Sequence, residues 1–215
     1  MRSEVLVVAQ PGRLPRIECR GGIAARSTEP DTVHLVSAAA TPLGGDTVAI
    51  RLVVEPGARL RLRTAAATVV LPGASTRESR SCWTIDVGGE LDLDPEPTVV
   101  AADSRHLSEI RMCLAGPAAG VRLRERVQIG RTGEREGFWS GSLRADVGST
   151  PLLRHRLELG GGAVADDVLG SPLACVSELR YPDPAAMADP YAAAVMLELA
   201  GGGSLATWQG DRLYS

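Results

Sequence analysis

The sequence contains no lysine and no asparagine, so all 23 of its basic residues are arginine. A Walker-type phosphate loop needs a lysine on the phosphates, and Schiff-base catalysis needs a lysine amine. Glycosylation of an Asn-x-Ser/Thr site needs an asparagine. The sequence therefore excludes these three kinds of site, although codon usage in a GC-rich genome is the simplest cause of the bias.

Other features are scarce as well. Aromatic residues are only 3% of the chain and the formal net charge is -3, so no basic field would attract nucleic acid or anionic lipid. No apolar run is long enough for a membrane span or a signal peptide. No cysteine belongs to a Cys-x-x-Cys pair. We expect a cytoplasmic protein with reduced cysteines that binds neither nucleic acid nor membranes.

Glycine and proline turns recur along the chain, with short alternating or β-branched runs between them. This pattern predicts many short strands. The clearest are residues 47–55, 58–64, 121–129 and 153–159, the first two joined by a reversal at Pro56 and Gly57. The chain is long enough to bury a core, and we expect one domain over residues 1–215 with mobile termini.

The last third of the sequence is harder to interpret. Residues 189–200 have an aspartate cap and an alanine-rich body typical of a helix. Residues 194–199 and 205–208 also flank a glycine turn, as the two strands of a hairpin would, and we favour the hairpin. Residues 163–189 contain three prolines and are the most loop-like stretch.

Two ionisable residues share a strand face with apolar neighbours. The period of two puts Glu125 between Leu123 and Val127, and it puts His155 between Leu153 and Leu157. A buried ionisable group must be paired, shifted in pKa or used chemically. For Glu125, the structural alternative is an ion pair with a nearby arginine, either Arg124, Arg126 or Arg131.

Signatures of enzymes are weak. The run Glu90, Asp92, Asp94 and Glu96 could supply the paired carboxylates of a glycosidase, but alternation predicts an ordinary solvated strand face. No Gly-x-Ser-x-Gly motif occurs, and we interpret residues 139–142, Trp-Ser-Gly-Ser, as a turn. Phe138 and Trp139 are predicted to anchor a partner or the edge of the core. We therefore expect a protein that is not an enzyme.

Four motifs, in order, carry a resemblance to a known family. They are Gly44-Gly45-Asp46, then Thr64 with the small residues to Thr68, then LDLDPEP at residues 91–97, and lastly Gly130-Arg131 followed by Glu136 and Phe138. In this order and spacing the chain resembles the UreD (UreH) family of urease accessory proteins, from about residue 33 to 159. The family fold is β-rich, with stacked strands in a solenoid-like body and at most a couple of short helices. An all-β fold is therefore expected on both grounds.

The resemblance also implies a function. Members are scaffolds that bind apo-urease and the partners UreF and UreG, and an interior tunnel with acidic residues is thought to conduct nickel. Residue by residue, Asp46, Thr68 and Glu125 match the family in character. His155 stands where some relatives carry an acid, and imidazole could serve the same ion. No tightly bound cofactor is implied; nickel would be in transit along Asp46, Glu125 and His155.

Alternatives remain open at this point. Asp46 could simply be a turn aspartate that accepts hydrogen bonds from nearby amides. The chain departs from the family at residues 37–41, where a Pro-Gly-Gly-rich turn is usual, and at Val69 and Val70, where a lysine and an aromatic residue are usual. A chaperone that carries nickel as stable cargo is the nearest rival function, and a β-helical glycan hydrolase is the rival from another class.

Overall fold

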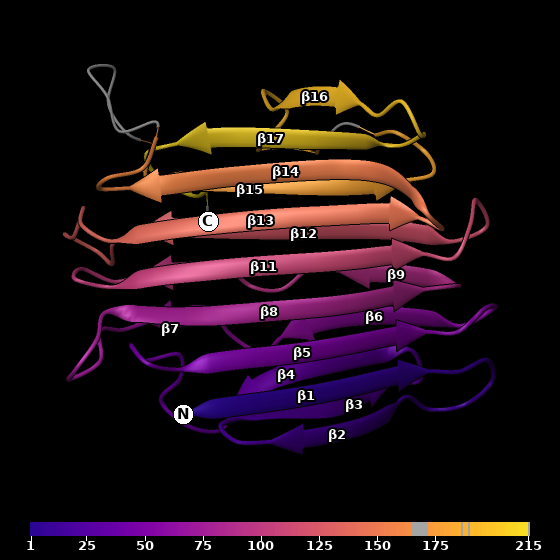
Figure 1. The fold of residues 1–215 in the computed structure, drawn as a ribbon, viewed down its shortest axis with the longest axis horizontal. Helices are drawn as coiled ribbons and strands as arrows, with labels where there is room; N and C mark the ends of the chain where they lie inside the picture. Colours follow the sequence, from indigo (N-terminus) through magenta and orange to yellow (C-terminus); the bar gives the residue numbers. More distant parts are fainter. Residues whose placement is uncertain (165–171, 186, 189, 215) are drawn as a thin grey trace.

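The described part of the chain is built from strands. The computed structural model describes residues 1–164, 172–185, 187–188 and 190–214. These residues form seventeen strands and no helix (Figure 1). Strands thus occupy far more of the chain than the 20–25% of an ordinary globular protein. The expectation of an all-β, solenoid-like fold is confirmed.

Two sheets lie face to face. Sheet A has seven strands, in the spatial order β14 (Thr150–Gly160), β13 (Phe138–Val147), β11 (Arg105–Leu114), β8 (Glu78–Val87), β5 (Thr47–Val54), β1 (Arg2–Ala9) and β2 (Arg16–Arg20). Sheet B has ten. Its main path is β16 (Val195–Glu198), β17 (Ser204–Gly210), β15 (Ala174–Tyr181), β12 (Gly120–Ile129), β9 (Glu90–Leu93), β6 (Arg59–Thr64), β4 (Thr32–Ser37) and β3 (Ile23–Glu29), and β10 (Thr98–Val100) and β7 (Thr68–Val70) pair beside it.

The chain winds as a coil between the sheets. It passes from β5 in sheet A to β6 in sheet B, back to β8, and onward through β9, β11, β12 and β13. Within each sheet, the neighbouring strands of this coil are therefore parallel. Thr47 pairs with Arg80 and Arg105 pairs with both Glu78 and Phe138, so successive turns take 33, 27 and 33 residues. The path of the backbone repeats from turn to turn, but the sequence does not.

The apolar side chains that alternate along the strands fill the space between the sheets. In β5 and β6, every second side chain is buried. The largest apolar cluster, which includes Leu52, Leu62, Ile85 and Leu123, occupies most of the interior. A second cluster surrounds Trp139 at the other end of the strands. Burial of this apolar surface is the main favourable term in folding.

Most predicted strands are confirmed, with three corrections. The reversal at Pro56 and Gly57 does not make a hairpin, because β5 and β6 belong to different sheets. Residues 139–142, expected to form a turn, lie inside β13, and Trp139 is buried in the core. The loop-like stretch 163–189 contains β15, which pairs with both β12 and β17, whereas residues 165–171, 186 and 189 lie outside the described residues.

The C-terminal ambiguity resolves in favour of strands. β16 and β17 form the expected antiparallel hairpin. The helix that residues 189–200 could have formed is not observed where that stretch is described. Strand pairing wins here because β17 also pairs with β15, which adds ladder hydrogen bonds that an isolated helix could not make.

An ion-pair cluster covers the outer face of sheet B. Glu178, only 1% exposed, accepts hydrogen bonds from Arg122, Arg124 and Arg180. Asp94 pairs with Arg122 and Arg126. The prediction of a solvated face for the acidic run 90–96 is wrong for Asp92 and Asp94, which are drawn into the cluster. The prediction that the acidic and the apolar residues of this run point to opposite faces is right.

Removal of Glu178 should destabilise the fold strongly. Glu178→Ala leaves arginine charges without their buried partner, and we expect the free energy of unfolding to fall by about 3–5 kcal/mol. Urea unfolding measures it. Glu90→Ala, which removes an exposed carboxylate paired with Arg59, is the control and should cost much less. Equal losses in the two variants would contradict a structural role for the cluster.

Candidate functional site

Sheet B is interrupted at one place along its length. β6 ends at Thr64 and β7 begins at Thr68, and next to them β9 ends at Leu93 and β10 begins at Thr98. β6 pairs with β9, and β7 pairs with β10, so the two interruptions lie side by side. β12 continues past both. The result is an opening in the wall of the sandwich.

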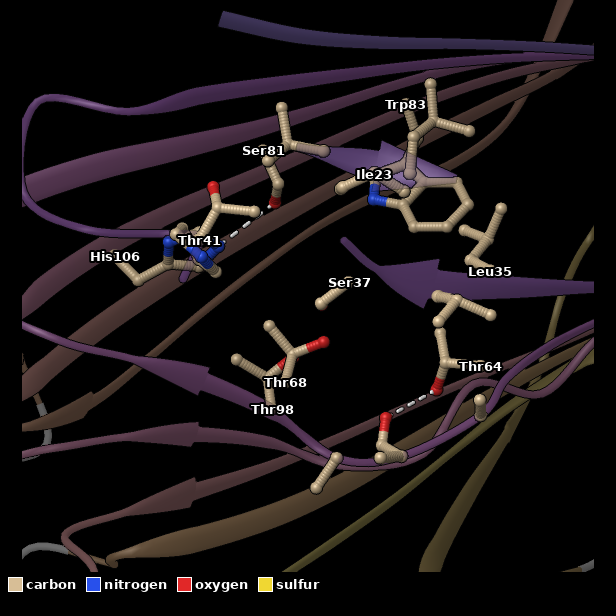
Figure 2. A pocket seen from close by; sticks show the side chains of 17 residues that line it. Ile23, Leu35, Ser37, Thr41, Thr64, Thr68, Ser81, Trp83, Thr98 and His106 are labelled. Carbon is tan, nitrogen blue, oxygen red and sulfur yellow. Dashed lines mark hydrogen bonds between the residues drawn. The ribbon is translucent and has the colours of Figure 1, made fainter. Parts of the chain in front are cut away.

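A cavity of about 230 Å³ lies behind this opening. Small residues 65–67 line it, as do Ile23, Leu35 and Trp83. Figure 2 shows Thr68 and Thr98 close together, with the hydrogen-bonded pair Ser81 and His106 on another wall. None of its lining residues is an arginine, an aspartate or a glutamate. The cavity therefore offers hydroxyl groups and one imidazole on an otherwise apolar surface.

His106 is the polar centre of this cavity, and the sequence analysis missed it. Its Nδ1 lies 2.9 Å from the Ser79 hydroxyl and its Nε2 lies 3.1 Å from that of Ser81. Burial lowers the pKa of His106 to about 4, so the imidazole is neutral near pH 7. The available signal was the row of small hydroxyl residues at inward positions: Ser79, Ser81 and Ser108.

Two narrower cavities continue from the first. A cavity of about 70 Å³ shares the Thr64, Thr68 and His106 walls and extends to Glu125. A cavity of about 10 Å³ shares Glu125 and Trp139 with it and ends at His155. The three form a series between the sheets that narrows from the opening in sheet B toward β14 and β15.

Glu125 lies where the second and third cavities meet. Its carboxylate accepts a hydrogen bond of 3.0 Å from Ser108, and burial raises its pKa to about 7 despite that bond. The structural alternative, an ion pair with a neighbouring arginine, is not found among the described residues. Arg124 and Arg126 point to the other face, where they bind Glu178 and Asp94. Glu125 is thus a half-buried carboxylate that lines a cavity and has no cationic partner in the described part of the chain.

His155 lies opposite Glu125 on the wall of the third cavity. β14 directs it inward, in register with Leu143 of β13. Burial lowers its pKa below the usual value. Ser177 of β15 lines the same cavity, and Cys175 is close enough for the charge of Glu125 to help burial raise its pKa. The structure therefore brings together two of the three predicted metal ligands, Glu125 and His155.

Asp46 does not line these cavities. It accepts hydrogen bonds of 2.9 Å from the Leu43 amide and from the Thr41 hydroxyl, and it also pairs with the N-terminal ammonium group. Burial would raise its pKa, but these donors together lower it. This is the turn geometry that the sequence analysis gave as the alternative. Thr41 itself lines the first cavity, so Asp46 supports its wall.

The remaining motif residues shape loops beside the passage. Gly44 packs so closely that a Cβ would lie 1.8 Å from the Thr76 carbonyl oxygen. Gly45 and Gly130 have φ of 92° and 79°, a region that glycine enters without strain. Arg131 binds Glu134 next to Gly130. Phe138 is buried, and the guanidinium of Arg105 lies 3.7 Å from its ring centre. Glu136 is exposed.

No ready-made metal site is present in the part of the chain that the structure describes. There, no three residues among histidine, cysteine, aspartate and glutamate converge as metal ligands would. The described part of the chain contains no helix that could span a membrane. The donors along the passage are instead spaced one after another, with Glu125 and His155 at its narrow end.

Comparison with known proteins identifies relatives. The family model described as "UreD urease accessory protein" matches residues 19–208. Urease accessory protein UreD 1 of Saccharopolyspora erythraea is 40% identical over 194 residues, covering 87% of this chain and 75% of that protein. UreD of Frankia casuarinae is 40% identical and UreD of Frankia alni 42% identical; the chain spans only 64% and 61% of their lengths.

The raised pKa of Glu125 predicts an unusual pH dependence of stability. Because the folded state binds this proton more tightly than the unfolded chain, stability should fall as the pH rises from about 4.5 to about 7. Glu125→Gln imitates the neutral form, so at pH 8 it should raise the free energy of unfolding, by about 3 kcal/mol. Near pH 4.5 the two proteins should be equal.

Denaturant unfolding at several pH values would measure this difference. Glu158→Gln is the matched control, since interaction with Arg156 lowers the pKa of Glu158 and its replacement should bring no gain at pH 8. If the stability of the Glu125→Gln protein follows that of the unchanged protein across the whole pH range, the raised pKa of this unpaired carboxylate is contradicted.

Proposed function

The chain belongs to the UreD family of urease accessory proteins, and on that premise we propose that it acts as a non-enzymatic scaffold in urease maturation. It would bind apo-urease on one surface and UreF and UreG on another, while nickel passes between them through the interior. Hydrolysis of GTP would belong to UreG, since this chain has no lysine to place on a phosphate.

The observation that supports this proposal is the series of cavities between the sheets. A conduit for a divalent ion needs a continuous space and a few donors, arranged so that the ion is held briefly. Glu125 and His155 supply a carboxylate and an imidazole, both suited to nickel. They come from β12 and β14, on opposite sides of the narrowest cavity. A closed sphere of four or more protein ligands would hold the ion too tightly for release.

The wide first cavity has a different part in this proposal. Its neutral lining of threonine and serine hydroxyls can hydrogen-bond to the water molecules of a hydrated ion. His106 is neutral, so it adds no positive charge that would repel the ion. The ion would exchange water for protein donors only as the space narrows toward Glu125.

Glu125 has a pKa suited to transient binding. At neutral pH its carboxylic acid and carboxylate are both populated. A nearby dication favours the carboxylate, so arrival of nickel would release a proton, and departure would allow the neutral form to return. We assign Asp46 a structural part, because its carboxylate is occupied by the donors that hold the wall beside Thr41.

Two rival functions make distinct predictions. A nickel carrier would bind the ion tightly as an isolated chain, which titration calorimetry with a nickel salt would detect. A β-helical hydrolase would cleave glycans from a substrate panel. The pairing of Asp92 and Asp94 with arginines counts against the hydrolase, because the acid and the nucleophile of a glycosidase must be free to act on the sugar.

Substitutions in the passage should reduce activation of urease. Glu125→Ala and His155→Ala each remove one donor, and we expect each to lower urease activation about tenfold, as loss of a metal-contacting or supporting group commonly does. Urease activity after co-expression with nickel is the measurement. Capture of UreF and apo-urease by the same variants should be largely unchanged.

Matched controls distinguish a path from a general defect. Glu158→Ala and His34→Ala remove the same two residue types from positions that line none of the three cavities, and they should activate urease normally. Full activation by the folded Glu125→Ala/His155→Ala double variant would exclude these residues as the nickel path. Loss of capture would show that they serve structure instead.

The scaffold role is tested by assembly. Affinity capture of the tagged chain, co-expressed with the urease subunits, UreF and UreG, should recover a complex. UreF should also raise the soluble yield, because exposed apolar residues such as Val195 and Leu197 favour aggregation of the isolated chain. A freely soluble monomer that captures none of these proteins would overturn the scaffold proposal.

A further inference from the structure

Sheet B extends farther than sheet A at one end of the sandwich. The last strand of sheet A, β14, faces β15, since His155 and Leu157 line the third cavity together with Ser177 and Leu179. Beyond β15, sheet B continues through β17 and β16, and Figure 1 shows both beyond β14. The inner face of this hairpin therefore projects past the end of sheet A.

This projecting face is apolar and exposed. Leu197 pairs with Leu205, which pairs with Leu179, so all three point to the same side as the buried core. Leu179 and Leu205 are at most 2% exposed, yet Leu197 is 57% exposed and Val195 is 67% exposed. We call Val195 and Leu197 the ledge. Their orientation is that of core residues, but nothing in the described part of the chain covers them.

The strand next to the ledge has a free edge. β14 pairs with β13 on one side, and no described strand pairs with its other side. An open edge presents unpaired amide and carbonyl groups that can bind a further strand. A strand added there, about 4.8 Å from β14, would face β17 across about 10 Å, the normal distance between packed sheets, and the ledge on β16 would lie beside it, one strand farther along.

The outer face around β14 carries a small excess of positive charge, because Arg111, Arg154 and Arg156 are paired with carboxylates while Arg144 is not paired among the described residues. Arg154 and Arg156 project there, in register with Arg144 and Ser142 of β13. Arg154 pairs with Asp146 and Arg156 with Glu158, but Arg144 has no ion pair among the described residues and stands between Arg154 and Arg111. Like charges directly opposite each other on neighbouring strands are unfavourable. An acidic side chain on an added strand would lie opposite Arg154 or Arg156 and form a favourable cross-strand pair.

We propose that β14 binds an extended segment of another protein, in which apolar residues alternate with acidic residues. Its backbone would pair with the free edge of β14. Its apolar side chains would turn inward and cover the ledge, and its carboxylates would turn outward and contact Arg154 and Arg156. Edge, ledge and charge each specify one property of this segment: extended, apolar on one face and acidic on the other.

A second copy of this chain does not fit the same position. In a β14-to-β14 pairing, the arginines of both copies would face one another, which is unfavourable. The projecting β16–β17 hairpin of each copy would also occupy the space that the other copy's sheet B needs. Sheet B extends past β15 by only two strands, β17 and β16, so the space beside β14 suits a single strand or a hairpin rather than a whole sheet.

A labelled peptide of about eight residues that alternates valine with glutamate is a suitable probe. Fluorescence anisotropy should show saturable binding to the full chain, and hydrogen exchange should show new protection of β14 amides. Arg154→Glu combined with Arg156→Glu should weaken binding about tenfold, the equivalent of 1.4 kcal/mol. A peptide with lysine in place of glutamate should prefer that double variant.

Matched variants test each part of the surface. Arg16→Glu combined with Arg20→Glu reverses charge on β2, the opposite edge of sheet A, and should leave binding unchanged. Leu197→Ser should weaken binding, whereas Met196→Ser, on the other face of β16, should not. The proposal is overturned if the acidic peptide fails to bind, if these variants have equal effects, or if the chain dimerises with β14 protected in the absence of peptide.

Discussion

The passage depends on a packing constraint, namely that two hydrogen-bonded sheets at a fixed separation must fill the space between them with side chains. Large apolar residues such as Leu62 and Ile85 fill it on one side, and the cluster around Trp139 fills it on the other. Between these clusters the inward positions hold Ser81, His106 and other small or polar residues. The sheets cannot approach each other locally, because the clusters hold them apart. The cavities are the volume that remains.

Strand parity is the most informative feature of the sequence. The alternation of apolar and polar residues correctly predicts that Glu125 and His155 point inward. The predicted limits of β5, β6 and β12 are accurate to about one residue. Alternation does not reveal which sheet a strand joins, so the turn at Pro56 and Gly57 looks like that of a hairpin. β15 escapes prediction because prolines flank it, although its own residues are almost entirely buried. His106 escapes it because its importance depends on contacts with β8, 25 and 27 residues away.

The two candidate donors illustrate what a resemblance to a family can transfer. Asp46 and Glu125 match the family equally well by motif, yet their surroundings differ. Three donors lower the pKa of Asp46, whereas burial raises that of Glu125 and leaves it one hydroxyl partner. A carboxylate that is already satisfied stabilises a turn; one that is not satisfied remains available to a passing cation. The distinction lies in tertiary contacts.

The coiled path of the chain has a consequence for how the protein opens. Each turn of the coil contacts mainly the turns beside it, so stability is approximately a sum over neighbouring pairs, and the terminal turns have only one neighbour each. One edge strand of sheet A is β14, which carries His155 and pairs only with β13 among the described strands. Detachment of β14 from β13 would break one ladder and leave the rest of the coil intact. Fraying of a single strand can therefore widen the narrowest part of the interior, without unfolding of the protein.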